Sequence, residues 1–231
     1  LVLTVPGFVA ADTGMDVLTH ATEAYTSNFA NDYTDGIALQ TIKLVFEWLE
    51  KSVKTADPEA REKMHNASTM AGMAFANAFL GMSHSMAHKI GGVHHTVHGR
   101  TNAILLPYVI RYNGTRPSKT TTWPKYNYWK ADEKFQDIAK MLGLPHSTPE
   151  EAVEAYAKAV YELGVAVGIK MNFKDQGIDE KAWKDSLHEI ALLAYEDQCS
   201  PANPRLPMVA DMEEIMADAY YGYAERPGRR K

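Results

Sequence analysis

Apolar residues recur at helical spacing along most of this 231-residue chain. In the segment from 32 to 54 they stand three or four positions apart, at Ile42, Val45, Phe46 and Leu49. This spacing places them on one face of a helix and predicts a single buried stripe. No stretch after residue 6 shows the sustained alternation of a half-buried strand. The pattern therefore predicts an all-α fold, a helical bundle of about eight to ten helices.

The next predicted helix, from residue 58 to 80, has a small apolar face. Its members are alanine and glycine at helical spacing: Ala67, Ala71, Gly72, Ala74, Ala76 and Ala78. Because small side chains let two helices approach closely, we expect this face to pack tightly against its neighbours. Phe75 and Phe79 on the same segment favour core packing, and Phe75 is also a candidate for the wall of a substrate pocket.

Capping residues mark several helix boundaries. Asp57 followed by Pro58 is typical of an N-cap with proline at the first helical position. The run Thr-Pro-Glu-Glu at 148–151 predicts a capping box and a helix that ends near Gly168. Asp179 predicts the start of a helix that reaches about residue 198, and a last helix is expected over 210–221.

Two helices are expected to be interrupted. Paired glycines destabilise a helix, so Gly91-Gly92 predicts a break after which the chain can turn back. Pro107 lies within a nearly continuous apolar run that follows His98. Proline removes a backbone donor and clashes with the preceding turn, so we expect Pro107 to kink that helix or to restart it.

The apolar run Leu-Val-Leu-Thr-Val at the start of the chain ends at Pro6. It predicts a stub strand cut from something larger, followed by a helix that Asp12 or Thr13 caps. The expected organisation is a remnant strand at 1–6, an all-helical domain at 7–222 and a basic, disordered tail at 223–231.

Composition narrows the classes of partner. The chain is 45% apolar and 23% charged, which is ordinary for a globular protein, and its net charge is −5. This mild acidity predicts neither a nucleic acid nor a membrane as partner. Cys199 is the single cysteine, which excludes an internal disulfide and fits a reducing compartment. We therefore expect a cytoplasmic protein.

Histidines cluster between Gly81 and Gly99, a segment that holds five of the nine in the chain. His84 and His88 stand four positions apart, which places both imidazoles on one helix face. A turn at the paired glycines would bring His98 back towards them. Clustered imidazoles are typical of a first-row divalent metal site, although a helix end with exposed histidines explains the pattern about equally well.

A second pair of donors favours the metal. Asp16 and His20 also stand four apart on a predicted helix, so they offer one oxygen and one nitrogen from the same face. Together with His84 and His98 they make three imidazoles and one carboxylate, a set that suits Fe(II) or Zn(II). Glu23 is either a supporting carboxylate beside this set or a core-edge residue.

These motifs carry a resemblance to a known family. TGMDVLTHATEAY, from Thr13, and the segment AFLGMSHSMAHKIGGVHHTVHGRTNAILLPYVIRYN resemble the iron-dependent (group III) alcohol dehydrogenases, and the likeness continues through EDQCSPANPR to AYYGY. It implies the C-terminal helical domain of the dehydroquinate synthase-like fold. It also implies that Asp16, His20, His84 and His98 bind the metal, and that His88 is the active-site histidine.

Within that family the segment from 111 to 139 is similar to the alcohol dehydrogenase part of the bifunctional aldehyde-alcohol dehydrogenases. Its aromatic residues Tyr126, Tyr128 and Trp129 favour a packed loop or a self-association surface over a nucleic-acid surface.

The histidine motif departs from the family pattern in two ways. Val97 stands where the family usually has proline, and His94, with its neighbour His95, adds extra candidate ligands. The remaining histidines, His65, His146 and His188, are expected at the surface.

The resemblance implies reversible hydride transfer between a short aldehyde, such as acetaldehyde, and the primary alcohol. It implies Fe2+ or Zn2+ in this chain and NAD on a nucleotide-binding domain that precedes it, since no G-x-G-x-x-G motif occurs here. We expect the chain to be inactive alone, and the complete protein to form a homo-oligomer or filament. A metal-dependent hydrolase and a non-catalytic assembly module are the alternatives. The turn with Asn203 and Arg205 is interpreted as structural.

Overall fold

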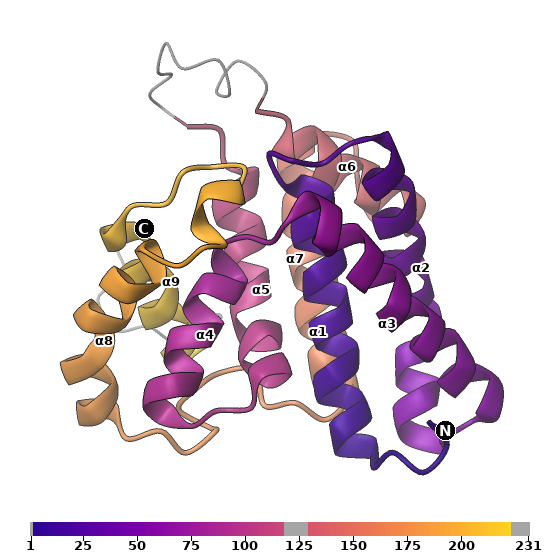
Figure 1. Ribbon diagram of the computed structural model, residues 1–231, viewed down its shortest axis with the longest axis horizontal. Helices are drawn as coiled ribbons and strands as arrows, with labels where there is room; N and C mark the ends of the chain where they lie inside the picture. The colour runs from indigo at the N-terminus through magenta and orange to yellow at the C-terminus, as the bar shows by residue number, and fades with distance from the viewer. Residues whose placement is uncertain (1, 118–128, 223–231) are drawn as a thin grey trace.

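The computed structural model describes residues 2–117 and 129–222. Across these ranges it contains nine α-helices, one short 3-10 helix and no strand (Figure 1). The α-helices are α1 (Gly7–Thr26), α2 (Asp32–Thr55), α3 (Pro58–Ala78), α4 (Met82–His94), α5 (His98–Gly114), α6 (Ala131–Met141), α7 (Pro149–Ala166), α8 (Glu180–Tyr195) and α9 (Val209–Tyr221). The all-α prediction is confirmed. Tyr126, Tyr128 and the tail at 223–231 lie outside the described residues.

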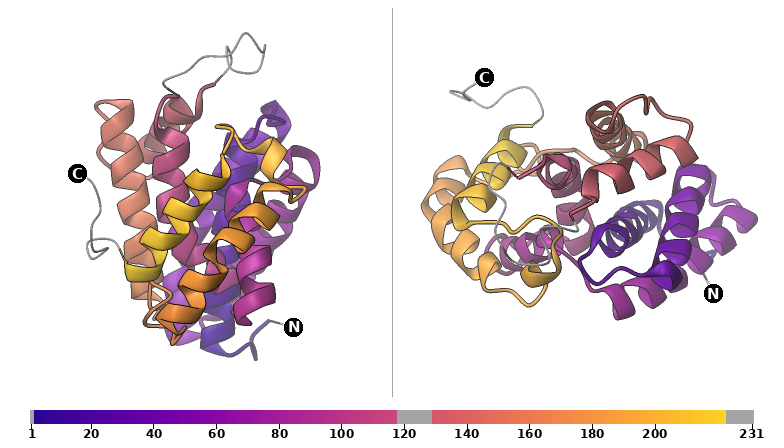
Figure 2. Two further views of the ribbon diagram at one scale, coloured as in Figure 1. Left: turned by 90° about the vertical axis from the view of Figure 1, so that its left-hand side faces the viewer. Right: turned by 90° about the horizontal axis from the view of Figure 1, so that it is seen from above.

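Helices α1 and α5 lie at the centre and divide the bundle into two parts. Helix α1 packs against α2 and α3, and α5 packs against α4, α7 and α9. Figure 2 shows α8 and α9 grouped on the opposite side of the molecule from α2 and α3. One apolar core, around Met15 and Leu49, also includes residues of α6 and α7, and a second core, around Met86 and Trp183, lies among α4, α5, α8 and α9. The elements that carry the predicted metal ligands therefore meet at the middle of the bundle.

The small face of α3 packs as predicted, with two exceptions. Ala67, Ala71, Ala74 and Ala78 are buried, whereas Ala76 is exposed and Gly72 is half-buried, with nothing within 4 Å of an added Cβ. Four buried alanines at helical spacing make a narrow stripe, and α3 uses it to contact both α1 and α2. Close packing of α3 against α1 brings Phe75 next to the predicted ligand His20.

The N-terminus does not form the predicted strand. Residues 3–5 form a turn, with a hydrogen bond from the amide of Val5 to the carbonyl of Val2 (3.4 Å). Helix α1 begins at Gly7, before either predicted cap, and Pro6 precedes it without a side-chain hydrogen bond. Asp12 instead lies inside α1, where it forms a two-bond ion pair with Arg100. A short apolar run becomes a strand only where another strand pairs with it, and none lies beside it in the described residues.

The predicted break at Gly91-Gly92 is also wrong, and of the two alternatives for Pro107 the restart is excluded. Helix α4 runs through Gly91-Gly92 and ends at His94, because His95 adopts the left-handed conformation (φ 55°) and donates its amide to Gly91. Helix α5 continues through Pro107 without restarting. Packing on both sides of these helices outweighs the local preference of the residues.

The N-caps predicted for α3, α7 and α8 are confirmed. The Asp57 carboxylate accepts from the amide of Ala60 (2.9 Å), and the Asp179 carboxylate accepts from the amide of Ala182 (2.9 Å). The hydroxyl of Thr148 caps α7 in the same way. Helix α8 nevertheless ends at Tyr195, three residues before the predicted position. No helix in the described part of the chain combines the length and the apolarity of a membrane span.

The contact between α1 and α5 predicts a large effect of one added methyl group. A Cβ at Gly99 would lie 2.2 Å from the carbonyl oxygen of Asp12, whereas a Cβ at Gly92 would meet nothing within 4 Å. Gly99→Ala should therefore destabilise the protein by about 1–3 kcal/mol, because backbone atoms must move. Gly92→Ala is the matched control and should stabilise α4 by about 0.5–1 kcal/mol.

Urea unfolding of the two variants beside the wild type measures both effects. Equal stability of the two alanine variants would contradict the close approach of α1 and α5.

Candidate metal centre

Helix α1 contributes two of the predicted ligands. Asp16 and His20 lie one turn apart, and the Nδ1 of His20 is 2.8 Å from the backbone oxygen of Asp16. A carbonyl oxygen only accepts hydrogen bonds, so Nδ1 carries the proton and Nε2 carries the lone pair. The ring of Phe75 stacks on His20 with 4.6 Å between centroids. His20 is thus fixed in the tautomer that can bind a metal through Nε2.

His84 comes from the first turn of α4 and is almost completely buried, with 1% of its side chain exposed. Its Nδ1 donates to the Glu23 carboxylate at 2.6 Å, which leaves a lone pair on Nε2. Glu23 also accepts from the amides of Gly81 (3.0 Å) and Ser83 (2.7 Å). This buried carboxylate therefore both fixes the start of α4 and orients His84, the supporting alternative of the two considered for it.

His98 begins α5 and approaches the same point from the third helix. Its Nε2 lies 3.6 Å from Oδ1 of Asp16, and the Nε2 of His84 lies 3.7 Å from that oxygen. The amide of Asn102, one turn further along α5, donates to Asp16 at 2.9 Å and accepts from the hydroxyl of Ser83. Sequence reasoning missed Asn102, although its spacing of four from His98 was a usable signal.

The spacing of the donor atoms fits a shared metal ion. Donors around a tetrahedral ion at about 2.0–2.2 Å are about 3.3–3.6 Å apart. The Nε2 atoms of His20 and His84 are 3.1 Å apart, close to that range. With both Nδ1 atoms protonated, two lone pairs face each other there, an unfavourable contact that a cation between them relieves. Asp16, His20 and His84 place one donor atom each within 4.8 Å of the others.

Burial keeps the imidazoles ready for a metal. Burial is the main cause that lowers the pKa of His20 from 6.5 to about 4, and a positive charge on the neighbouring His84 acts in the same direction. Burial also lowers the pKa of His98. Metal binding requires the neutral imidazole, so at neutral pH no proton has to be displaced from these two side chains.

This lowered pKa predicts an acid-sensitive fold in the metal-free protein. Between pH 6.5 and about 4 the imidazole of His20 binds a proton in the unfolded chain and stays neutral in the folded chain. Stability is therefore complete above pH 6.5 and is lost as the pH falls through this window, by an amount on the order of 3 kcal/mol. Urea unfolding at pH 7 and pH 4.5 should show a steeper loss for the wild type than for His20→Asn. Parallel losses in the two proteins would contradict the assignment.

His88 lies next to the donor cluster, one turn after His84 on α4. Its ring stacks on that of His98 at 5.5 Å between centroids and meets the ring of His84 edge-on at 6.1 Å. Its side chain is 35% exposed, compared with 1% for His84. His88 is thus placed beside the site with access to solvent, as an active-site histidine requires.

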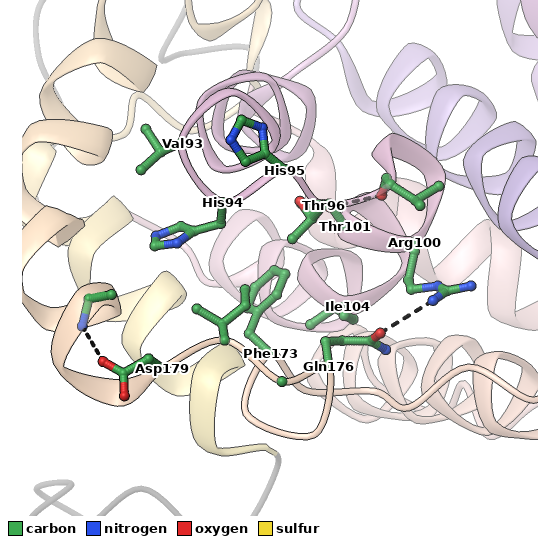
Figure 3. A pocket seen from close by; sticks show the side chains of 14 residues that line it. Val93, His94, His95, Thr96, Arg100, Thr101, Ile104, Phe173, Gln176 and Asp179 are labelled. Carbon is green, nitrogen blue, oxygen red and sulfur yellow. Dashed lines mark hydrogen bonds between the residues drawn. The ribbon is translucent and has the colours of Figure 1, made fainter.

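The two extra candidates, His94 and His95, point elsewhere. The Nε2 of His94 lies 2.9 Å from the hydroxyl of Ser186, and its ring packs against Trp183. Both histidines line a pocket of about 450 Å³ between the α4–α5 turn and the start of α8. Figure 3 shows Arg100 and Gln176, which share a hydrogen bond, on another wall of this pocket. Neither histidine belongs to the donor cluster.

The remaining polar residues singled out in the sequence have structural contacts. His65, His146 and His188 are exposed, as predicted. The side-chain oxygen of Asn203 accepts from the amide of Met82 at 3.2 Å, at the start of α4. The guanidinium of Arg205 donates to the backbone of α5 (2.9 Å), so this turn ties α4 and α5 together.

Comparison with known proteins matches almost the whole chain to one family. Residues 10–220 match the sequence model of the Fe-containing alcohol dehydrogenase family, C-terminal. The aldehyde-alcohol dehydrogenase of Streptococcus pneumoniae serotype 2 is 80% identical over 231 residues, and the bifunctional aldehyde-alcohol dehydrogenase AdhE of Escherichia coli K12 is 40% identical over 227 residues. The alignments cover 100% and 96% of this chain, respectively. In both cases the chain spans 26% of the relative's length.

Solved structures agree on the fold. The crystal structure of a 1,3-propanediol oxidoreductase aligns with a TM-score of 0.83 at 36% identity, covering 94% of this chain and 53% of that one. An alcohol dehydrogenase from Oenococcus oeni aligns with the same TM-score at 33% identity, with the same two coverages. The chain belongs to the iron-containing alcohol dehydrogenase family, of which it matches the C-terminal helical part.

Proposed function

We propose that this chain is the metal-binding half of the alcohol dehydrogenase part of an aldehyde-alcohol dehydrogenase. The proposed reaction interconverts a short aldehyde, such as acetaldehyde, and the primary alcohol with NAD(H). The observation that carries the proposal is the meeting of Asp16, His20 and His84, whose donor atoms lie within 4.8 Å of one another. The Nε2 of His98, on α5, lies 3.6 Å from the same carboxylate. The 80% identity to an aldehyde-alcohol dehydrogenase supports the choice of substrate class.

The proposed ligands are Asp16, His20, His84 and His98, and the proposed ion is Fe2+, with Zn2+ accepted by the same donor set. When bound, such an ion supplies a Lewis acid for the substrate oxygen. The chain's own residues orient the ligands. Glu23 holds the imidazole of His84, and the carbonyl of Asp16 holds that of His20.

His88 is the proposed proton carrier. It lies one turn from His84, and its partial exposure connects the site with solvent. It would take the hydroxyl proton of the alcohol at Nε2 during oxidation and return it during aldehyde reduction. Phe75, which already packs on His20, is the proposed apolar wall beside the substrate.

The hydride carrier comes from outside these residues. The chain contains no glycine-rich phosphate loop, so the proposed partner is a nucleotide-binding domain of the same polypeptide, on which NAD lies. The complete protein is proposed to be a homo-oligomer or filament in the cytoplasm, with no nucleic acid and no membrane as partner.

The test compares the iron-loaded or zinc-loaded chain alone with the complete dehydrogenase that contains it. NADH oxidation with acetaldehyde should be absent or nearly so for the chain alone and present for the complete protein. Turnover by the chain alone would contradict the proposal that NAD lies on a separate nucleotide-binding domain. Hydrolysis of simple esters or phosphoesters by the metal-loaded chain, without alcohol dehydrogenase activity in the complete protein, would favour a metal-dependent hydrolase instead.

A further inference from the structure

A second polar cluster lies beside the metal centre and contains none of the predicted metal ligands. Its centre is Asp197, in the turn that follows α8, whose side chain is only 7% exposed. Its Oδ2 is 3.1 Å from Nδ1 of His88 and 2.8 Å from the ammonium of Lys89. Its Oδ1 accepts the amide of Cys199 at 3.0 Å. Three donors from two parts of the chain thus meet on one carboxylate.

These contacts decide which nitrogen of His88 carries a proton. The carboxylate is ionised: burial alone would raise the pKa of Asp197, but the hydrogen bonds from Lys89, the amide of Cys199 and His88 lower it to about 2. An ionised carboxylate only accepts hydrogen bonds. Nδ1 of His88 must therefore be the donor, and the lone pair of the neutral ring is on Nε2.

The backbone around Asp197 is itself held in place. The amide of Asp197 donates to Ala194 (3.2 Å) and its carbonyl accepts from the amide of Ser200 (3.1 Å). The hydroxyl of Ser200 also bonds to Ser85 on α4, at 3.0 Å. The carboxylate is thus rigidly attached to the helix that carries His88, which is the arrangement expected of a group that orients another side chain.

The geometry points to Asp197 as a positioning residue that fixes the ring orientation and the Nε2 lone pair of His88, with Lys89 holding the carboxylate in place. This inference rests on the proposed function for the role of His88 in proton transfer. Asp197, in the turn after α8, would thus affect the reaction only by orienting His88 and would not contact the substrate.

A metal ion on the same cluster is the competing interpretation. His88, Asp197 and Cys199 place donor atoms within 4.8 Å of one another. Lys89 already brings a positive charge to the oxygen that would bind the ion, and burial raises the pKa of the Cys199 thiol to about 12, with the charge of Asp197 adding to the rise. Both features disfavour a cation there, because a metal needs the thiolate.

The test is Asp197→Ala, which removes the carboxylate that both Lys89 and His88 contact. Nδ1 of His88 then has no acceptor at this position, so the proton is no longer held on Nδ1. In the complete dehydrogenase, kcat should fall about 10–100-fold with little change in KM for the aldehyde. Asp197→Glu should retain part of the activity. Asp185→Ala, on an exposed ion pair with Lys181, is the matched control and should have no effect.

Nitrogen-15 NMR of the zinc-loaded chain gives a readout independent of activity. The wild type should show the proton of His88 on Nδ1, and Asp197→Ala should shift it towards Nε2 while the zinc content stays at one per chain. An unchanged tautomer, or loss of a second zinc from the variant, would overturn the inference. Absence of dehydrogenase activity in the wild type, together with the expected tautomer shift, would instead count against the proposed function alone.

Discussion

Replacing His84 by alanine should abolish stoichiometric metal binding. His84 places its Nε2 next to those of the other donors and is the most deeply buried of them, so no water-exposed side chain can take its place. Loss of a residue that only supports a ligand costs about 10–100-fold in metal affinity, and loss of the ligand itself should cost more than that. Elemental analysis of the purified wild type should give one iron or zinc per chain, and the variant none.

Two further variants separate ligation from folding. His98→Ala removes a half-exposed ligand, and its buried neighbour Asn102 keeps its hydrogen bonds to Asp16 and Ser83. The variant should therefore weaken metal binding in a protein that stays folded. His95→Ala is the matched control, because His95 is an exposed histidine three positions away that faces the neighbouring pocket. Full metal content in His98→Ala, or its loss in His95→Ala, would contradict the ligand set.

Glu23→Ala should be among the most destabilising single substitutions in the chain. It would leave the amides of Gly81 and Ser83 and the Nδ1 of His84 without their buried acceptor. Each such donor costs about 1–3 kcal/mol, so the three together should cost at least about 3 kcal/mol. For a chain of this size that lowers Tm by at least about 6 °C.

The measurement is thermal unfolding of the metal-free protein, followed by zinc titration. Glu23→Ala should show both the lower Tm and a metal affinity reduced by about 10–100-fold, since His84 loses its orienting partner. Glu50→Ala on an exposed face of α2 is the matched control and should change the free energy of unfolding by less than about 0.5 kcal/mol. Similar stability of the two variants would refute the supporting role of Glu23.

Much of the fold follows from local patterns. The stripe at Ile42, Val45 and Leu49 is fully buried, as helical spacing predicts. Residues that satisfy the orphan amides of a helix, such as Asp57 and Thr148, mark its start in the sequence, and the structure uses both. The candidate metal ligands could be predicted in the same way, because a spacing of four brings Asp16 and His20 together on any helix.

The errors arise where tertiary packing outweighs local preference. Gly91 and Gly92 remain helical because α4 packs against α5 and α8. The apolar run before Pro6 has no neighbouring strand in the described residues, and periodicity cannot distinguish such a short run from a turn.

The contacts between the site histidines and residues far away in the sequence were the least predictable. Glu23 is 61 positions from His84, and Asp197 is 109 positions from His88. A single sequence contains no signal for such pairs, because only the packing of α1 and of the turn after α8 against α4 creates them. The spacing of four between His98 and Asn102 is the exception, since a helix alone brings these two side chains together.

The most direct test of the central claim is an anomalous diffraction map of the iron-loaded or zinc-loaded protein at the metal absorption edge. The account predicts one peak about 2.0–2.3 Å from Asp16 and from the Nε2 atoms of His20, His84 and His98. A peak on His94, or on the cluster of His88 and Asp197, would contradict it, as would the absence of any peak in crystals of protein that elemental analysis shows to contain the metal.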